Sequence, residues 1–328
     1  MSAALSPNTQ AILLLTAPLI AGRCAPSEDL LSDEDYNRLA RHLRDLKLQP
    51  LDLLAGEAGA VLDACRALVD PDRLRRLLGR GFLLGQMVER WQTRGIGVVS
   101  RADAVYPRRL KARLREDAPP VLYGCGDFGL VDRGGLAVVG SRNADGAAID
   151  YATAIGGLAA EAGRAVISGG ARGVDEAAML GAVEAGGTVI GVLADSLEQC
   201  SMVRAWRNGL RDGRMLLVSP YDPAARFDDG HAMRRNRLIH ALADAALVVA
   251  AEAGKGGSWA GAIEQIERLQ LVPVFVRSAG ARSAGLDALR GRGARDWPEP
   301  CDAEAFRALL DGAVDASGHE PAALRSNL

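Results

Sequence analysis

Three short segments of this chain combine glycine with a cation or a hydroxyl, which is typical of phosphate binding. They lie at residues 140–142, 168–175 and 254–258. The second follows an apolar run at 165–167 and precedes a helical pattern at 176–185. Unpaired N–H groups at a helix start and the helix dipole favour an anion, and glycine lets a phosphate approach the backbone. The three segments therefore predict a phosphate site, without specifying the phosphate compound.

Short apolar runs alternate with helical patterns around these segments. The apolar runs are 136–139, 165–167, 188–193, 215–218, 246–249 and 272–276, and the helical patterns are 147–162, 174–185, 202–211, 232–242 and 259–269. This alternation predicts an α/β fold, a Rossmann-like doubly wound parallel sheet with helices on both faces. Right-handed crossovers place all strand-to-helix loops at the carboxyl edge, where we expect the three glycine segments to form one crevice.

The regions flanking this sheet predict further domains. Apolar residues at helical spacing over 33–46 and 71–91, with Ser32 and Asp72 as expected caps, indicate a small all-helical N-terminal domain. The apolar run 11–21 is interrupted by Pro18 and is too short to span a bilayer, so it predicts a buried helix. We divide the chain into a helical domain (1–94), a linker strand with a basic helix (95–135), a Rossmann-like domain (136–300), and a closing helix with a frayed tail (301–328).

Composition excludes several classes of protein. With 39 basic and 41 acidic residues the net charge is −2, so nucleic-acid binding would have to rest on local clusters. The five cysteines form no C-x-x-C pair, which argues against a structural metal or disulfides and favours a reducing cytoplasm. No G-x-G-x-x-G follows the first apolar run and no Walker A motif is present, so we expect no NAD, ATP or other cofactor.

Arg142 follows a strand end and a glycine, so its guanidinium is expected to face the crevice and bind a phosphate through two parallel hydrogen bonds. The alternative is an ion pair with Asp175 that joins two loops. Asp175 itself is expected to cap the following helix, because a lone carboxylate repels phosphate. Arg172 lies in the second glycine segment, and Lys255 in the third can reach the same phosphate path.

Three further basic clusters leave alternatives open. The arginines of residues 234–237 either bind phosphate or form an internal network with Asp228 and Asp229. Arg204, Arg207 and Arg211 recur on one predicted helix face and could extend the phosphate groove, while Trp206 is expected to be packed. The basic stretch at 106–115 is either a solvated face or a phosphate contact.

Several of these pieces together resemble the DNA-processing protein A (DprA/Smf) family. They are Tyr106-Pro107, Ala118–Tyr123, Gly140-Ser141-Arg142, Ser168–Asp175, Arg235-Asn236-Arg237 and Gly257-Ser258, in the order of the family. The sequence departs from the family pattern at Met179, at Pro220 and at Trp259.

The resemblance implies a cytoplasmic, homodimeric protein without enzymatic activity. Such a protein binds and protects single-stranded DNA during natural transformation and helps to load the RecA recombinase. The resemblance and the glycine segments together predict that DNA phosphates bind at Gly140, Ser141, Arg142, Ser168, Gly169, Gly170, Arg172, Gly173, Arg235, Asn236, Arg237, Lys255, Gly257 and Ser258.

The alternative is a nucleotide sensor or a nucleotide-processing enzyme on the same fold, with a role in phage defence. The phosphoribohydrolases that share the fold carry a Gly-Gly-x-Gly-Thr-x-x-Glu motif, which this chain lacks, and Glu252 and Glu264 are the only candidate acids near the third segment.

Overall fold

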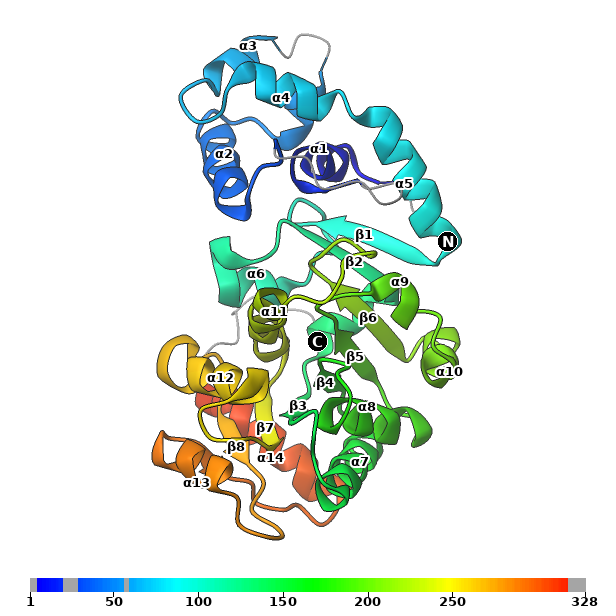
Figure 1. The fold of residues 1–328 in the computed structure, drawn as a ribbon, viewed down its shortest axis with the longest axis vertical. Coiled ribbons are helices and arrows are strands. Elements are labelled where there is room, and N and C mark those ends of the chain that lie inside the picture. Colours follow the sequence, from blue (N-terminus) through cyan, green and yellow to red (C-terminus); the bar gives the residue numbers. More distant parts are fainter. Residues whose placement is uncertain (1–4, 20–28, 56–58, 318–328) are drawn as a thin grey trace.

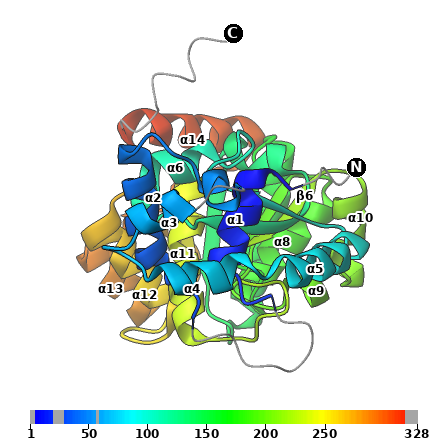
Figure 2. The ribbon, with the colours of Figure 1, turned by 90° about the horizontal axis from the view of Figure 1, so that it is seen from above.

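The computed structural model describes residues 5–19, 29–55 and 59–317. Helices form the N-terminal part and lie above the sheet in Figure 1, and the view from above in Figure 2 shows them covering it. They are α1 (Pro7–Thr16), α2 (Asp33–Asp45), η1 (Pro50–Leu54), α3 (Gly59–Ala64), α4 (Pro71–Leu78) and α5 (Gly81–Thr93). The predicted buried helix is confirmed, because α1 buries a continuous stretch from Ala11 to Leu15; residues 20–21 of that run lie outside the described ranges.

A nine-stranded sheet forms the centre of the described chain, with the order β1-β2-β6-β5-β4-β3-β7-β8-β9. The strands are β1 (Ile96–Ser100), β2 (Val121–Gly126), β3 (Leu136–Gly140), β4 (Val166–Ser168), β5 (Val189–Val192), β6 (Met215–Ser219), β7 (Ala245–Ala250), β8 (Val274–Val276) and β9 (Arg295–Asp296). The strands from β6 to β9 in this order pair in parallel, whereas β1 pairs with β2 and β2 with β6 in antiparallel fashion.

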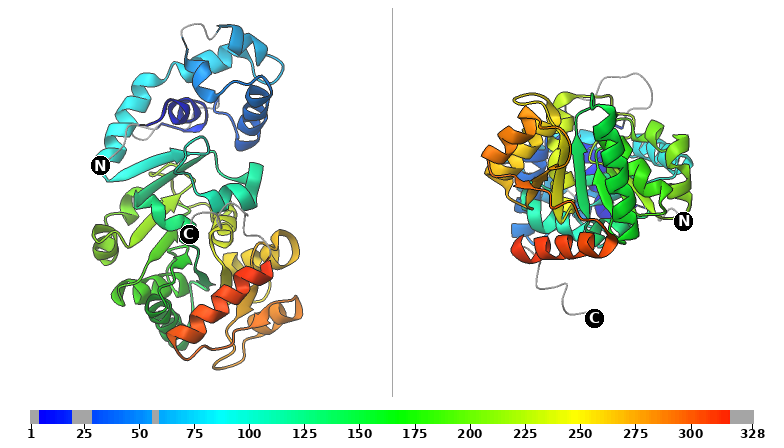
Figure 3. Two further views of the ribbon diagram at one scale, coloured as in Figure 1. Left: turned by 180° about the vertical axis from the view of Figure 1, so that it is seen from behind. Right: turned by 90° about the horizontal axis from the view of Figure 1, so that it is seen from below.

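Helices cover both faces of this sheet, which confirms the Rossmann-like doubly wound fold. Alternate strand residues point to opposite faces. Leu136 and Val138 belong to a core with α7 (Gly146–Glu161), α8 (Val174–Glu184) and α14 (Ala303–Ser317). The helix α14, in red, lies in front in the left view of Figure 3, which is seen from behind. Ala137 and Val139 belong to a core with the helices of the other face, which are α6 (Arg108–Leu114), α11 (Asp229–Leu242), α12 (Gly256–Glu264) and α13 (Ala284–Gly291).

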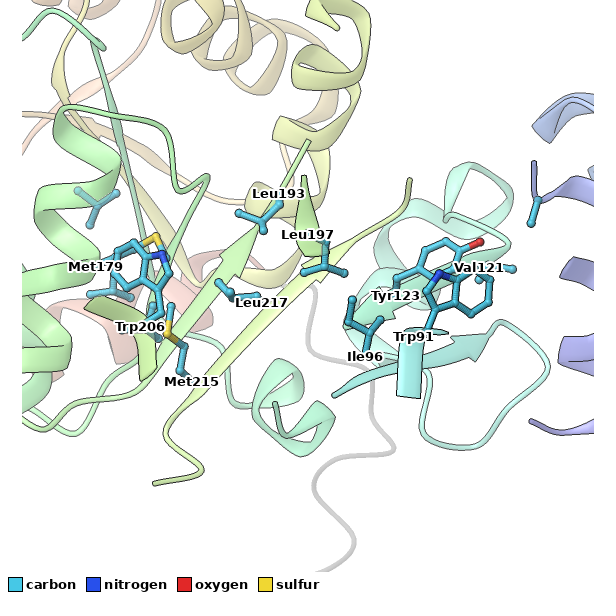
Figure 4. Close-up of a cluster of buried hydrophobic side chains, with 14 of the residues drawn as sticks. Trp91, Ile96, Val121, Tyr123, Met179, Leu193, Leu197, Trp206, Met215 and Leu217 are labelled. Carbon is cyan, nitrogen blue, oxygen red and sulfur yellow. The ribbon is translucent and has the colours of Figure 1, made fainter. Parts of the chain in front are cut away.

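The N-terminal helices share one hydrophobic core with the sheet. Trp91 of α5 packs edge-to-face on Tyr123 of β2, with ring centres 5.1 Å apart. The same cluster continues through Leu217 to Trp206, as Figure 4 shows. The strands β1 and β2, expected in a linker, are therefore part of the main sheet, with β1 at its edge and β2 between β1 and β6, while the four-domain division stays a prediction.

Two local expectations about the helices are wrong. Asp70, not Asp72, caps α4, the first of the two helices that share the pattern at 71–91, by accepting from the Arg73 N–H (3.1 Å). Residues 311–317 continue α14 rather than fraying, and 318–328 lie outside the described ranges. The remaining short elements are η2 (Arg115–Asp117), η3 (Phe128–Arg133), α9 (Leu197–Cys200), η4 (Arg204–Trp206), α10 (Arg207–Arg211) and η5 (Gln265–Leu269).

Candidate functional site

A crevice of about 580 Å³ opens at the carboxyl ends of β3 and β7, where the strand order reverses. Such switch points are the usual ligand sites of open α/β sheets. We call it the loop crevice; its walls include Gly140, Ser141, Arg142, Ala171, Asp175, Arg235, Asn236, His240, Glu252, Lys255, Gly256, Gly257 and Ser258. All three glycine segments contribute residues, so the prediction that they meet in one crevice is confirmed.

Hydrogen bonds between the loops hold the crevice in shape. The Ser258 hydroxyl donates to the Gly140 carbonyl (2.6 Å), and the Asn236 side-chain amide donates to the Gly257 carbonyl (3.1 Å). The buried Ser168 hydroxyl donates to the Val138 carbonyl inside the sheet (2.6 Å). Ser168 and Ser258 therefore use their hydroxyl hydrogens on acceptors within the protein.

The N-terminus of α12 lines this crevice and is suited to an anion. Its N-cap, Lys255, makes no side-chain capping hydrogen bond, and Gly256 and Gly257 place no side chain over the first turn. The first N–H groups of a helix have no intrahelical partner, and the helix dipole adds partial positive charge there. The second segment lines the crevice only with Ala171 and Asp175. The helix start that faces the crevice is therefore that of α12 more than that of α8, where the sequence placed the anion site.

Asp175 and Arg235 lie beneath the loops. Asp175 is 6% exposed and accepts hydrogen bonds from the Gly140 and Gly169 N–H groups, both at 3.2 Å. Arg235 is 5% exposed and donates from Nη1 to the Val192 carbonyl (2.7 Å). Burial raises the pKa of Asp175, although the neighbouring Arg235 guanidinium opposes this shift. Asp175 is therefore a clamp between loops rather than the predicted cap of α8, whose N-cap is Gly173.

Gly169 is required because of this clamp. A Cβ at this position would lie 1.6 Å from Arg235 Nη1 and 2.6 Å from Asp175 Oδ2. Gly170 and Gly173 instead have φ values of 66° and 96°, which glycine adopts without strain. The glycines of the second segment thus serve the backbone and the buried pair, and any phosphate contact by them or by Arg235 stays a prediction.

Arg142 is the free cation of the loop crevice. Its side chain is exposed, and its guanidinium carbon lies 4.6 Å from the centre of the Phe227 ring. No acidic group of the described residues forms an ion pair with it, and the carboxylate of Asp175 is engaged elsewhere. The alternative of an Arg142–Asp175 pair is therefore wrong, and the guanidinium keeps its donors for a ligand.

The other predicted crevice cations are partly engaged. Arg172 is exposed and donates to the Asn143 side chain (3.2 Å), next to Arg142 on a neighbouring hollow. Lys255 is 73% exposed and forms an ion pair with Glu252 (2.8 Å). Both side chains remain accessible to a ligand, because surface pairs of this kind contribute little and exchange readily.

The arginines of residues 234–237 separate onto different faces of α11. Arg237 points away from the loop crevice and pairs with Glu264 (2.8 Å), and Arg234 is exposed near the Tyr221 ring. Asp228 caps the helix by accepting from the His231 N–H (2.9 Å). The alternative of an internal network between these arginines and Asp228 and Asp229 is therefore wrong.

Arg204, Arg207 and Arg211 do not line the loop crevice. Arg204 belongs to η4 and the other two to the five-residue α10, so no single helix carries the predicted stripe. Arg204 and Arg211 border a hollow beside Gly186 and Arg214, where α8 ends and β6 is about to begin. That is the amino edge of the sheet, opposite the crevice; Trp206 is packed, as expected.

A family model described as DNA recombination-mediator protein A matches residues 97–297 of this sequence. The match covers more than half of the chain and includes every loop of the crevice. The chain belongs to this family.

Two curated relatives are named DNA processing protein DprA. The protein of Mycobacterium tuberculosis is 31% identical over 254 residues, which is 74% of this chain and 61% of the relative. That of Bacillus subtilis is 26% identical over 190 residues, 56% of this chain and 62% of the relative. The chain therefore spans less than two thirds of the length of these relatives.

Two solved structures of DNA processing protein A have the same fold. The Streptococcus pneumoniae protein aligns with a TM-score of 0.67 at 19% identity, over 94% of this chain and 98% of the other. The Helicobacter pylori protein, described with its single-stranded DNA binding mode, aligns with a TM-score of 0.54 at 22% identity, over 67% of this chain and 96% of the other. At these identities the likeness establishes the fold of this DprA-family chain.

Sequence reasoning missed two residues of the site, Phe227 and His240. Phe227 is 46% exposed and is the ring on which Arg142 lies. His240 is 2% exposed, lines the crevice from α11, and has no hydrogen bond at Nδ1. A lone aromatic in a polar loop and a lone histidine inside an apolar helix pattern were the available signals. Neither signal locates a residue without the fold.

His240→Leu is expected to remove an acid-sensitive part of the stability of the protein. Burial lowers the pKa of His240 to about 4, from 6.5. The unfolded chain therefore binds the proton first, and stability falls as pH drops from 6.5 towards 4, by about 3 kcal/mol from this group. Urea unfolding of parent and variant at both ends of this window measures the difference. An equal loss in both proteins would contradict the assignment.

Among the described residues no group of three or more His, Cys, Asp and Glu side chains could hold a metal ion. In the same ranges no helix is long and apolar enough to cross a membrane.

Proposed function

We propose that this DprA-family chain binds single-stranded DNA as a recombination mediator, with the phosphates of the strand in the loop crevice. The observation that carries the proposal is the meeting of three glycine loops around an unpaired Arg142, which lies on an exposed aromatic ring. Phosphates need N–H donors and guanidinium groups, and bases of a single strand stack on aromatic rings. The Helicobacter pylori relative, whose description names single-stranded DNA, supports the same ligand.

The residues of the site contribute in two ways. Arg142, Arg172, Lys255 and the α12 N-terminus at Gly257 offer charges and donors to phosphates, and Phe227 offers a face to a base. Arg237 lies outside the crevice, paired with Glu264. The other predicted residues support these groups from below or beside them; they are Gly140, Ser141, Ser168, Gly169, Gly170, Gly173, Arg235, Asn236 and Ser258.

Arg142→Gln is expected to weaken single-strand binding about tenfold, because it removes a charge-assisted contact to one phosphate. The slope of log affinity against log salt should fall by about 0.7, the value for one phosphate of a single strand. Fluorescence anisotropy of a labelled oligonucleotide across a salt series measures both quantities. Thermal unfolding should be unchanged, since the side chain is exposed and unpaired.

Arg204→Gln is the matched control, because Arg204 is equally exposed but lies at the opposite edge of the sheet. We expect no change in affinity or salt slope. If Arg142→Gln binds DNA as tightly as the parent and Arg204→Gln binds it more weakly, the DNA lies at the amino edge of the sheet. That result would refute binding in the loop crevice.

We further propose that the protein protects strands and assists RecA loading, as a homodimer in the cytoplasm, during transformation. These roles would follow from a strand bound at one edge of the sheet with its remaining length free. Strand exchange by RecA on DNA coated with single-strand-binding protein tests the loading role. The parent should accelerate it and Arg142→Gln should not.

We also propose that the chain is not an enzyme, and in particular that it does not process nucleotides. Glu264 pairs with Arg237 (2.8 Å) and with Arg268, and Glu252 pairs with Lys255. Both candidate acids are therefore engaged by basic side chains of the chain itself. Release of free base from nucleoside monophosphates in the presence of the protein would overturn this proposal.

A further inference from the structure

A second cavity, of about 960 Å³, lies on the other side of α11 from the loop crevice. Its walls come from α1 and α2, from the segment joining α6 to β2, and from the loop that follows β6. We call it the Tyr221 cleft; Pro119, Pro120, Tyr221, Asp222, Arg226 and Arg234 characterise it. Cavities of this size at the junction of two parts of a fold are common ligand sites.

The helix α11 is a wall shared by both cavities. Arg234 and Leu238, four residues apart, face the Tyr221 cleft, whereas Arg235 and Asn236 face the loop crevice. In Figure 1 this helix lies in the middle of the molecule, between α6 and α12. A ligand chain in the loop crevice therefore needs to cross only one helix to reach the cleft.

The loop before α11 connects the two cavities in the same way. Arg226 lines the Tyr221 cleft, and the next residue, Phe227, lies against Arg142 of the loop crevice. In this loop, adjacent residues therefore belong to the two cavities.

Two of the four cleft arginines are free for a ligand. Arg90 binds Glu198 through two hydrogen bonds of 2.8 and 2.7 Å, and Arg237 is paired with Glu264. Arg226 and Arg234 are both exposed, and neither forms an ion pair with any residue in the described ranges. The Arg234 guanidinium carbon lies 6.0 Å from the centre of the Tyr221 ring. Unpaired guanidinium groups on one wall are suited to a phosphate.

The rest of the wall suits a heterocyclic base. Pro119, Pro120 and Leu238 provide apolar surface, and the Tyr221 ring is held by stacking on His231, with centres 3.7 Å apart. One oxygen of Asp222 accepts from the Ala224 N–H (2.9 Å), while the other, Oδ2, is buried without a hydrogen-bond partner. Asp222 also lines the cleft, so a base seated there would lie next to this side chain.

We propose that the Tyr221 cleft binds a nucleotide, with the phosphate on Arg226 and Arg234 and the base on the apolar wall near Asp222. The nucleotide is either free in solution or a unit of the strand in the loop crevice. A nucleotide that is a unit of the strand rests on the proposed function, whereas a free nucleotide does not.

The test uses the full chain and two probes, 5-bromodeoxyuridine monophosphate and a single-stranded oligonucleotide that contains the same base. Affinities are measured for the parent, for Arg226→Gln combined with Arg234→Gln, and for Arg142→Gln. Arg282→Gln is the control, because this side chain is 90% exposed and lines neither cavity. Ultraviolet cross-linking followed by peptide mapping locates each probe.

The cleft variant should lose about tenfold in affinity for at least one probe. Cross-links should fall on residues of the Tyr221 cleft. If the monophosphate is affected and Arg142→Gln leaves its binding unchanged, the source is a free nucleotide. If the oligonucleotide is affected in both variants, the source is the bound strand.

Parent-like binding of both probes by the cleft variant, with cross-links confined to the loop crevice, would overturn the proposal. Loss of oligonucleotide binding in Arg142→Gln alone would then leave the proposed DNA function intact. A parent that binds the monophosphate in the cleft but no oligonucleotide would instead refute the DNA function and keep the cleft site.

Discussion

Asp175→Asn is expected to lower the free energy of unfolding by about 3–5 kcal/mol, the usual cost of leaving a buried charge uncompensated. The amide would leave the Arg235 guanidinium buried without a counter-charge. It would also weaken the acceptors of the Gly140 and Gly169 N–H groups, which belong to two different loops. Urea denaturation at neutral pH measures the change.

Two further variants separate this clamp from a general effect of substitution in α8. Glu176→Gln changes the adjacent carboxylate, which is only half-buried and forms no ion pair with the described residues, and should cost less than about 1 kcal/mol. Arg235→Met added to Asp175→Asn should recover part of the loss, because it removes the unpaired charge. Additive losses in the double variant would contradict a coupled pair.

Loss of the clamp should also affect the proposed DNA site. Asp175 fixes Gly140, whose carbonyl accepts from Ser258 at the start of α12. A loosened Gly140 therefore displaces both Arg142 and the α12 N-terminus, so single-strand affinity should fall even where the variant is fully folded.

The parallel sheet and its crevice could be predicted because local patterns determine them. Apolar runs such as residues 246–249 became β7, and the glycines after β3, β4 and β7 reached one edge because right-handed crossovers allow no other placement. The periodicity of residues 232–242 likewise predicted most of α11.

Burial within the site could not be predicted. Arg235 and Arg142 look equivalent in the sequence, yet one is buried against Asp175 and the other is exposed on Phe227. The difference arises from the rotation of α11 about its axis, which long-range packing decides. For the same reason β2, read as an extended entry, became an antiparallel strand of the sheet between β1 and β6.

The basic stretch at 106–115 illustrates how structure decides between two readings of the same charges. Arg109 forms an ion pair with Asp244 (2.6 Å), whose other oxygen accepts from the Gly135 N–H (2.7 Å). Arg113 donates to the Ala243 carbonyl at the end of α11 (2.5 Å). Burial lowers the pKa of Arg113 to about 10. Arg109 and Arg113 therefore fasten α6 to α11 and are neither a solvated face nor available to phosphates, whereas Arg108, Lys111 and Arg115 are exposed, as the solvated-face reading expects.

Arg109→Ala is therefore expected to destabilise the protein by about 3–5 kcal/mol, since Asp244 is 2% exposed and would keep a buried, unpaired charge. Arg108→Ala is the matched control one residue away. Its side chain is 60% exposed in the pair with Asp132, and it should cost about 1 kcal/mol or less. Thermal and urea unfolding of both variants measure the difference.

DNA binding by the same two variants decides the role of the stretch. At a temperature where Arg109→Ala is still folded, both should bind single strands with the salt slope of the parent, because neither residue lines the loop crevice. A reduced slope in the stable Arg108→Ala variant would mean that phosphates reach α6. The strand would then pass over the face of the sheet that carries α6 and α11, and the crevice would hold only part of its length.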